Sequence, residues 1–206
     1  MQTDVAIQKQ IYQMKTHLII SAHPSENSFS NYLAQQLTEN FQTRGWKTEW
    51  RNLYDGSFDP VLSGRDLQTL KAGNTPEAIR KEQVKMAEAE LITVIYPLWW
   101  ASFPAVLKGY IDRVLTNGFA YSYGPEGVKG LLGGKRVVLH TTMGNTVEEY
   151  EDKGLIDAFK ASQGDEVFGF CGMTVENHLF YPQITLADEE KRNHFLEKAL
   201  AAYTEL

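Results

Sequence analysis

The length, composition and charge of the chain exclude several classes of protein. It has 206 residues, of which 43% are hydrophobic and 22% charged, an ordinary globular composition that argues against disorder and fibrous repeats. The chain has 26 Asp and Glu and 20 Lys and Arg, which gives a formal net charge of −6. This negative charge disfavours nucleic acid as a partner. The single cysteine, Cys171, excludes an intramolecular disulfide and is typical of a cytoplasmic protein.

The first 15 residues differ in character from the rest. They contain no apolar run of signal-peptide length, and Asp4 stands early among them. Their apolar residues fit one or two weak amphipathic turns: Val5, Ile7, Ile11 and Met14. We expect residues 1–15 to form an extension and residues 16–206 to form one domain. We expect no membrane insertion, since no run of about 18 apolar residues occurs.

The remaining chain alternates between expected strands and helices. Short apolar runs rich in β-branched residues predict strands at residues 16–22, 46–53, 91–96 and 136–142, with further candidates at 166–171 and 174–181. Apolar residues at helical spacing predict helices at residues 28–41, about 66–71, 76–89, 103–115, 147–162 and 187–203. The alternating pattern of residues 46–53 favours an edge strand, and the Gly-rich residues 117–134 are expected to be a loop.

Strand–helix alternation with apolar strands predicts an α/β fold. We expect a doubly wound sheet of about five parallel strands with helices on both faces. In such sheets, ligands bind beyond the carboxyl ends of the strands, where the strand order reverses. The residues that follow the expected strands are therefore the first place to look for chemistry.

The first strand ends in a polar loop, Ser21–Asn31 (SAHPSENSFSN). Hydroxyls, amides and His23 gather there at the start of an expected helix, whose free N–H groups suit a phosphate. The same residue types are common helix caps, so an elaborate cap is the alternative. Neither a Walker pattern nor G-x-G-x-x-G occurs, so the usual dinucleotide fingerprint is missing.

Two further strand ends carry polar and aromatic residues. Trp99 and Trp100 offer a flat wall for a planar heteroaromatic ligand, with core packing or a protein interface as the alternative. After the next strand, Gly144 permits a close backbone approach, and Tyr150 offers a phenolic donor; a plain turn is the alternative there. A phosphate cradle, an aromatic wall and a polar clamp together describe an FMN or FAD site.

Five segments in order resemble the flavodoxin-like NAD(P)H:quinone oxidoreductases. These segments are HPSENSFSN at 23–31, PLWWASFPAVLKGYIDRV at 97–114, GFAY at 118–121, TTMG at 141–144 and FCGM at 170–173. The family includes the mammalian quinone reductases, bacterial drug-activity modulators and the ancillary reductase of a glutathione-gated potassium efflux system. The resemblance covers residues 15–206 and implies a flavodoxin-like, flavin-binding domain.

The resemblance also implies which residues contact the flavin. Its phosphate would be held by His23, Ser28, Phe29, Ser30 and Asn31. Its ring would lie against Pro97, Leu98, Trp99, Trp100 and Ala101, and against Thr141, Thr142, Met143, Gly144 and Asn145. Met143 stands where the family often has Gly, and some relatives have an aromatic in place of Ala101. Gly144, Asn145 and Tyr150 are the expected catalytic residues. No His between Tyr150 and Cys171 matches the histidine that assists hydride transfer in the mammalian enzymes.

The implied activity is a two-electron, ping-pong transfer of hydride. NADH or NADPH would reduce flavin N5, and a quinone-like acceptor would reoxidise it. FMN is the expected cofactor, with FAD as the alternative, and relatives of this kind are homodimers. Alternative functions are an azo- or nitro-compound reductase, a regulatory reductase subunit docked on a potassium efflux transporter, and an electron-carrier flavodoxin. The five His lack metal-ligand spacing, so no metal is expected, and Cys171 is expected to be buried rather than a nucleophile.

Overall fold

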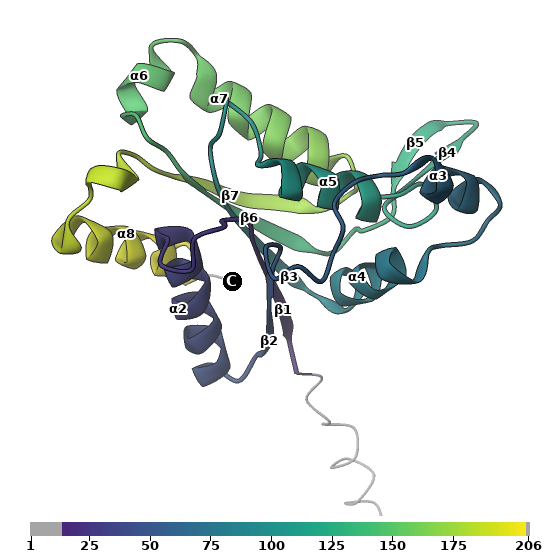
Figure 1. The fold of residues 1–206 in the computed structure, drawn as a ribbon, viewed down its shortest axis with the longest axis horizontal. Coiled ribbons are helices and arrows are strands. Elements are labelled where there is room, and N and C mark those ends of the chain that lie inside the picture. The colour runs from purple at the N-terminus through teal and green to yellow at the C-terminus, as the bar shows by residue number, and fades with distance from the viewer. Residues whose placement is uncertain (1–13, 205–206) are drawn as a thin grey trace, which may run out of the picture.

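The structure, a computed structural model, describes residues 14–204 and is built around one parallel sheet (Figure 1). Its five strands pair in the order β2-β1-β3-β6-β7, every neighbouring pair parallel. The strands are β1 (Thr16–Ser21), β2 (Lys47–Asn52), β3 (Leu91–Pro97), β6 (Arg136–Thr142) and β7 (Thr174–Tyr181). The chain moves outward from β1 to β2 and then returns to β3 on the other side, so the strand order reverses between β1 and β3. This arrangement confirms the expected doubly wound α/β fold. The extension expected at residues 1–15 lies outside the described residues except for 14 and 15.

Helices cover both faces of the sheet (Figure 1). Helices α2 (Phe29–Thr43) and α8 (Glu189–Ala201) share one hydrophobic core with the sheet. Helices α4 (Glu77–Glu88), α5 (Ala105–Val114) and the π-helix η1 (Lys160–Gly169) share the other. Shorter helices are α3 (Gly64–Lys71), α6 (Val147–Glu151), α7 (Leu155–Phe159) and the 3-10 turn η2 (Ile184–Leu186). Because β3 is covered on both faces, all seven of its residues are buried, which explains its unbroken apolar sequence.

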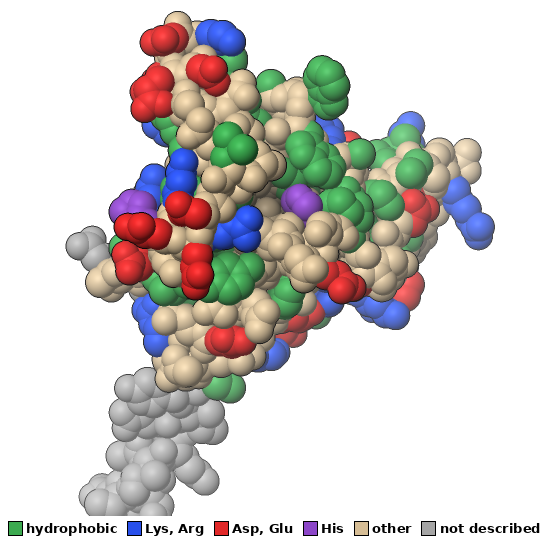
Figure 2. Space-filling model, turned by 60° about the vertical axis from the view of Figure 1, so that its left-hand side comes forward, with side chains coloured by type: hydrophobic (Ala, Val, Ile, Leu, Met, Phe, Trp, Pro, Cys, Tyr) green, Lys and Arg blue, Asp and Glu red, His purple; other side chains and the backbone are tan. Residues whose placement is uncertain are grey.

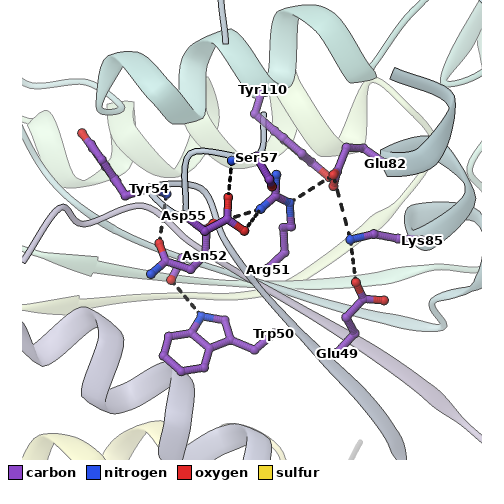
Figure 3. A network of polar contacts seen from close by, with 11 residues as sticks. Glu49, Trp50, Arg51, Asn52, Tyr54, Asp55, Ser57, Glu82, Lys85 and Tyr110 are labelled. Atoms are coloured by element: carbon purple, nitrogen blue, oxygen red, sulfur yellow. Dashed lines mark hydrogen bonds and ion pairs between the residues drawn. The ribbon is translucent and has the colours of Figure 1, made fainter. Parts of the chain in front are cut away.

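Strand β2 lies at the edge of the sheet, as its alternating sequence indicated. A buried ion pair attaches this edge to α4: the Arg51 guanidinium lies 3.1 Å from Glu82 and 2.6 Å from Asp55 (Figure 3). On the outer side, Lys85 reaches Glu49 at 2.7 Å. Removing one partner of such a buried pair leaves the other charge buried and unpaired. The network therefore fixes the edge strand β2 against α4.

The expected strand at residues 166–171 is wrong. Residues 160–169 instead form η1, and the helix expected over 147–162 is divided into α6, α7 and the beginning of η1. The buried residues of η1 are Gln163, Gly164 and Phe168; Phe168 follows the other two by five and four positions, spacings that suit the wider turn of a π-helix. Of the apolar residues that imitate a strand pattern, Val167 and Phe168 lie in this helix, whereas Phe170 and Cys171 lie just beyond it and Phe170 is 41% exposed.

The expected loop at 117–134 contains an antiparallel hairpin, β4 (Tyr121–Gly124) and β5 (Gly127–Gly130). Glycines hide the strand pattern there, but one of them has a packing role. A Cβ added to Gly130 would lie 2.3 Å from the backbone nitrogen of Gly172. The absence of a side chain at residue 130 therefore lets the hairpin rest directly on the segment that precedes β7.

Candidate functional site

The carboxyl ends of β1, β3, β6 and β7 meet at one edge of the sheet. The backbone N–H of Ala22 donates to Ile95 at 2.9 Å, that of Leu98 to Thr142 at 2.8 Å, and that of Met143 to Tyr181 at 2.9 Å. The rings of His23 and Trp99 are 5.9 Å apart. The structure therefore brings together the three segments that the sequence singled out.

The loop after β1 is organised by the buried side chain of Asn31. Its Nδ2 donates to the carbonyls of His23 at 3.2 Å and Ser25 at 2.9 Å, while its Oδ1 accepts from the Ser21 hydroxyl at 3.0 Å. The indole of Trp50 also donates to the Ser21 hydroxyl, at 2.9 Å. The Asn31 side chain thus shapes the loop, and its hydrogen-bonding groups are engaged within the protein.

Other groups in this loop are free to meet a ligand. Ser28 caps α2 by accepting from the N–H of Asn31 at 3.2 Å, so the first turn of a 15-residue helix faces the loop. The Nδ1 of His23 accepts from the N–H of Ser25 at 3.1 Å. Burial lowers the pKa of His23, so its ring is neutral near pH 7 with its proton on Nε2. The Ser30 hydroxyl is buried and has no partner among the described residues.

A strained turn, Trp99–Ser102, follows β3. Trp100 and Ala101 adopt positive φ angles of 52° and 57°, a conformation that costs a non-glycine residue about 1–2 kcal/mol. Reciprocal hydrogen bonds between Trp99 and Ser102, at 3.2 and 3.0 Å, close the turn. The Trp100 side chain is fully exposed and that of Trp99 is 40% exposed, so core packing does not account for either. Leu98, by contrast, is buried beneath the turn.

The loop after β6 offers backbone rather than side chains. Thr141, Thr142 and Met143 are buried, whereas Gly144 and Asn145 are exposed. Met143 packs with Leu98 in a small core that Tyr150 also contacts, and the ring of Tyr150 stacks edge-on against Phe159 at 5.7 Å. Half-buried Tyr150, on α6, therefore packs against the same small core as Met143 and Leu98.

Three residues near the site escaped the sequence analysis: Tyr96, Gln163 and His178. The Nε2 of His178 lies 2.8 Å from the Thr141 hydroxyl and 3.3 Å from the Tyr96 hydroxyl, and Tyr96 donates to Gln163 at 2.6 Å. Burial lowers the pKa of His178 to about 3. Gln163 and His178 stand inside a helix and a strand with no motif around them, and Tyr96 stands before the PLWW segment without an evident role of its own. The register of β3, β6 and β7 brings Tyr96, Thr141 and His178 together, and η1 adds Gln163.

A cleft of about 270 Å³ adjoins the loop after β1. It is lined by Glu26, Asn27, Phe29, Asn31, Tyr32, Gln35, Trp50 and Arg192. A larger hollow of about 830 Å³ lies along α4 and the loop after β2, where Arg80 and Glu77 pair with one another. We assign the candidate site to the strand ends because donors, aromatic surface and backbone strain coincide there.

The surface around the site is uneven in character. Figure 2 shows a histidine near the centre of the view with hydrophobic side chains above it and to its right, and acidic side chains gathered at the top and at the left. Within residues 14–204, no cluster of three or more His, Cys, Asp or Glu suits a metal ion. No helix of this described part is long and apolar enough to cross a membrane. Cys171 is buried, as expected, and burial raises the pKa of its thiol to about 11.

Comparison with known proteins defines the class. Residues 15–206 match the family model described as a flavodoxin-like fold. An uncharacterized NAD(P)H oxidoreductase of Haemophilus influenzae is 38% identical, with 89% of this chain and 91% of the relative covered. NAD(P)H dehydrogenase [quinone] 1 of Cavia porcellus is 33% identical, with 84% of this chain and 68% of the relative covered. The solved NAD(P)H:quinone oxidoreductase of Methanothermobacter marburgensis superimposes with a TM-score of 0.79 at 28% identity, covering 94% of this chain and all of that one.

The chain belongs to the flavodoxin-like NAD(P)H:quinone oxidoreductase family, as its five motifs indicated. It is therefore an enzyme of the oxidoreductase class.

Proposed function

We propose that this protein is a flavin-dependent NAD(P)H:quinone oxidoreductase with its flavin at the carboxyl ends of β1, β3 and β6. The observation that carries the proposal is the convergence of three segments: a loop rich in hydrogen-bond donors, a pair of exposed tryptophans and a backbone-lined turn. No side chain transfers hydride by itself, so this class of reaction requires a bound redox cofactor.

The residues present fit a flavin phosphate and ring. The unpartnered Ser30 hydroxyl, the Nε2–H of His23 and the first N–H groups of α2 would hold the phosphate. Trp99 and Trp100 would pack against the ring. When bound, a flavin accepts hydride from a nicotinamide and passes two electrons to an electron-poor acceptor. The family relationship supports this assignment for His23, Ser28, Phe29 and Ser30, and Asn31 would contribute by shaping the loop, since its own polar groups bind within the protein.

The remaining site residues would orient the ring and its substrate. One side of the flavin ring would be formed, together with the tryptophans, by Pro97, Leu98 and Ala101. The edge of the ring would lie along the backbone of Thr141, Thr142, Met143, Gly144 and Asn145. Backbone N–H groups at Gly144 and Asn145 can stabilise negative charge, and Tyr150 can donate a phenolic hydrogen bond. We assign these last three residues to catalysis.

FMN is our proposed cofactor, and FAD is the alternative. The 270 Å³ cleft beside the phosphate loop, with the basic side chain of Arg192, has room for part of an adenylate. Chromatography of the flavin released by heat distinguishes the two cofactors.

We further propose a cytoplasmic homodimer. Exposed hydrophobic side chains gather at the hairpin β4–β5 and next to it: Tyr123, Val128, Leu131 and Phe170. Single exposed apolar residues are common, but several on one segment favour an interface. No observation favours docking on a transporter.

Steady-state kinetics test the proposed reaction. Oxidation of NADH or NADPH should be measured with benzoquinone varied at several fixed nicotinamide concentrations. We expect parallel double-reciprocal lines, because donor and acceptor use the same site in turn. Turnover with an azo dye but not with quinone would favour the azoreductase alternative. A flavin-loaded protein with no turnover of either nicotinamide would be an electron carrier, and the proposal would be wrong.

A further inference from the structure

The strained turn Trp99–Ser102 needs support from outside itself. Both central residues adopt the left-handed conformation that glycine or asparagine usually supplies, and neither is glycine here. The side chains of Trp100 and Ala101 are exposed, so packing contributes little to holding them. Strain of this kind persists only where surrounding structure holds it.

The side chain of Gln163 on η1 donates a hydrogen bond to the backbone of this turn. It is only 4% exposed. Its Oε1 accepts from the Tyr96 hydroxyl at 2.6 Å, and its Nε2 points to the carbonyl of Ala101 at 3.4 Å, the longer of its two contacts. Because the Ala101 carbonyl can only accept, the amide nitrogen of Gln163 must face the turn, and Oε1 therefore accepts the proton of the Tyr96 hydroxyl.

Tyr96 in turn belongs to a buried polar cluster. Its hydroxyl has donated its proton, so His178 Nε2 must be the donor in their 3.3 Å contact; the same Nε2 lies 2.8 Å from Thr141. This tautomer leaves Nδ1 as a bare acceptor, in agreement with its lack of a partner among the described residues. The cluster thus connects β7, β6 and β3 to the turn through Gln163.

We propose that Gln163 is a positioning residue that holds the Trp99–Ser102 turn in the conformation that presents both tryptophans to the ligand. This inference rests on the proposed function for the identity of the ligand, but not for the restraint of the turn. The π-helix η1 supports this role, because Gln163 lies on its buried face together with Gly164 and Phe168.

The test compares three variants. Gln163→Leu removes both contacts, whereas Gln163→Glu keeps an acceptor for Tyr96 but replaces the donor that faces Ala101. Gln83→Leu is the matched control: Gln83 is also buried and donates to Val114 and Thr116, both at 3.0 Å, on α5 and the turn that follows it. FMN dissociation constants are measured by fluorescence titration of each apoprotein, with thermal unfolding as the check on folding.

We expect Gln163→Leu and Gln163→Glu to raise the FMN dissociation constant about five- to tenfold, the worth of roughly one lost hydrogen bond. Gln83→Leu should lower the melting temperature to a similar extent and leave the FMN dissociation constant unchanged. An FMN dissociation constant within twofold of the wild type for Gln163→Leu, or an equal rise for Gln83→Leu, would overturn the proposal.

A second readout needs no flavin. Chymotrypsin cleaves after exposed aromatic residues, so release of the turn should speed cleavage after Trp100 in the Gln163→Leu apoprotein, but not in Gln83→Leu. If the wild type binds no flavin and this cleavage still accelerates, the proposed function fails and the restraint by Gln163 stands. If the wild type binds flavin but neither readout changes, the inference about Gln163 fails alone.

Discussion

At the scale of single residues, the site combines exposed hydrophobic surface with backbone strain. Trp100 is the clearest case, because its side chain is fully exposed while its φ angle is 52°. A folding role would bury an indole, which provides a large apolar surface. The strained conformation of this turn is therefore better explained by a role in ligand binding than by a contribution to the stability of the fold.

Replacing Trp100 with alanine tests this explanation. We expect Trp100→Ala to weaken flavin binding by about 1–2 kcal/mol, the order of a lost aromatic contact. The free energy of unfolding should change by less than about 0.5 kcal/mol, because an exposed side chain is removed. Flavin titration and urea unfolding measure the two quantities. Val61→Ala, at a position 66% exposed and outside the site, is the control. Unchanged flavin binding would mean that other residues build the wall.

Sequence reasoning located the site's loops but not its buried support. HPSENSFSN and PLWW stand at strand ends, where chemistry is expected, and both carry residue types with an obvious role. Gln163 and His178 lack such signals. Their partners lie 62 and 37 positions away in the sequence, so only tertiary structure reveals them.

At the scale of elements, the hairpin β4–β5 depends on a backbone-to-backbone contact. Gly130 has no room for a Cβ, which would lie 2.3 Å from Gly172 N. At Gly124, in the same hairpin, the nearest atom to an added Cβ is 3.9 Å away. The two glycines therefore differ in packing although both belong to short strands.

We expect Gly130→Ala to lower the free energy of unfolding by about 1–3 kcal/mol, since overpacking forces backbone to shift. Gly124→Ala should change it by less than about 1 kcal/mol. Urea unfolding of both variants measures the difference. Equal effects would show that the hairpin does not rest on the segment before β7 as described.

The elements themselves were predictable to different degrees. Strands β1, β3 and β6 are apolar, β-branched runs ended by proline or polar residues, and their sequence predicts them well. The hairpin was missed because its three glycines, Gly124, Gly127 and Gly130, remove the alternating pattern. The segment 166–171 was mistaken for a strand because Val167, Phe168, Phe170 and Cys171 form a short apolar run, which in the structure crosses the end of the π-helix η1.

At the scale of the whole molecule, buried neutral histidines connect the helices to the sheet. The imidazole of His140 lies 2.6 Å from the hydroxyls of both Tyr181 and Tyr203. The Tyr203 hydroxyl lies 2.8 Å from that of Thr93, which in turn lies 2.8 Å from Nε2 of His17. Burial lowers the pKa of His17 and of His140 to about 3, as it does that of His178.

These pKa values predict acid sensitivity. Below pH 6.5 the unfolded chain binds protons on these histidines while the folded protein does not, so stability is lost as pH falls toward 3. Between pH 6 and pH 5 the three residues should lower the free energy of unfolding by about 3–4 kcal/mol. Asp55, whose pKa its hydrogen bonds and Arg51 lower to about 2, contributes only below about pH 4. Urea unfolding at the two pH values measures the change, and His178→Gln should remove about a third of it. A stability that stays constant over this interval would contradict the neutral, buried state of the histidines.

The most direct test of the account is the flavin content of the purified protein. We predict a yellow protein with absorption bands near those of oxidised flavin and about one flavin released per chain on heating. If the preparation is colourless, incubation with FMN and then FAD should restore the bands and quench the emission of the exposed tryptophans. A protein that remains colourless and unquenched after both incubations would contradict the assignment of a flavin to the carboxyl ends of β1, β3 and β6.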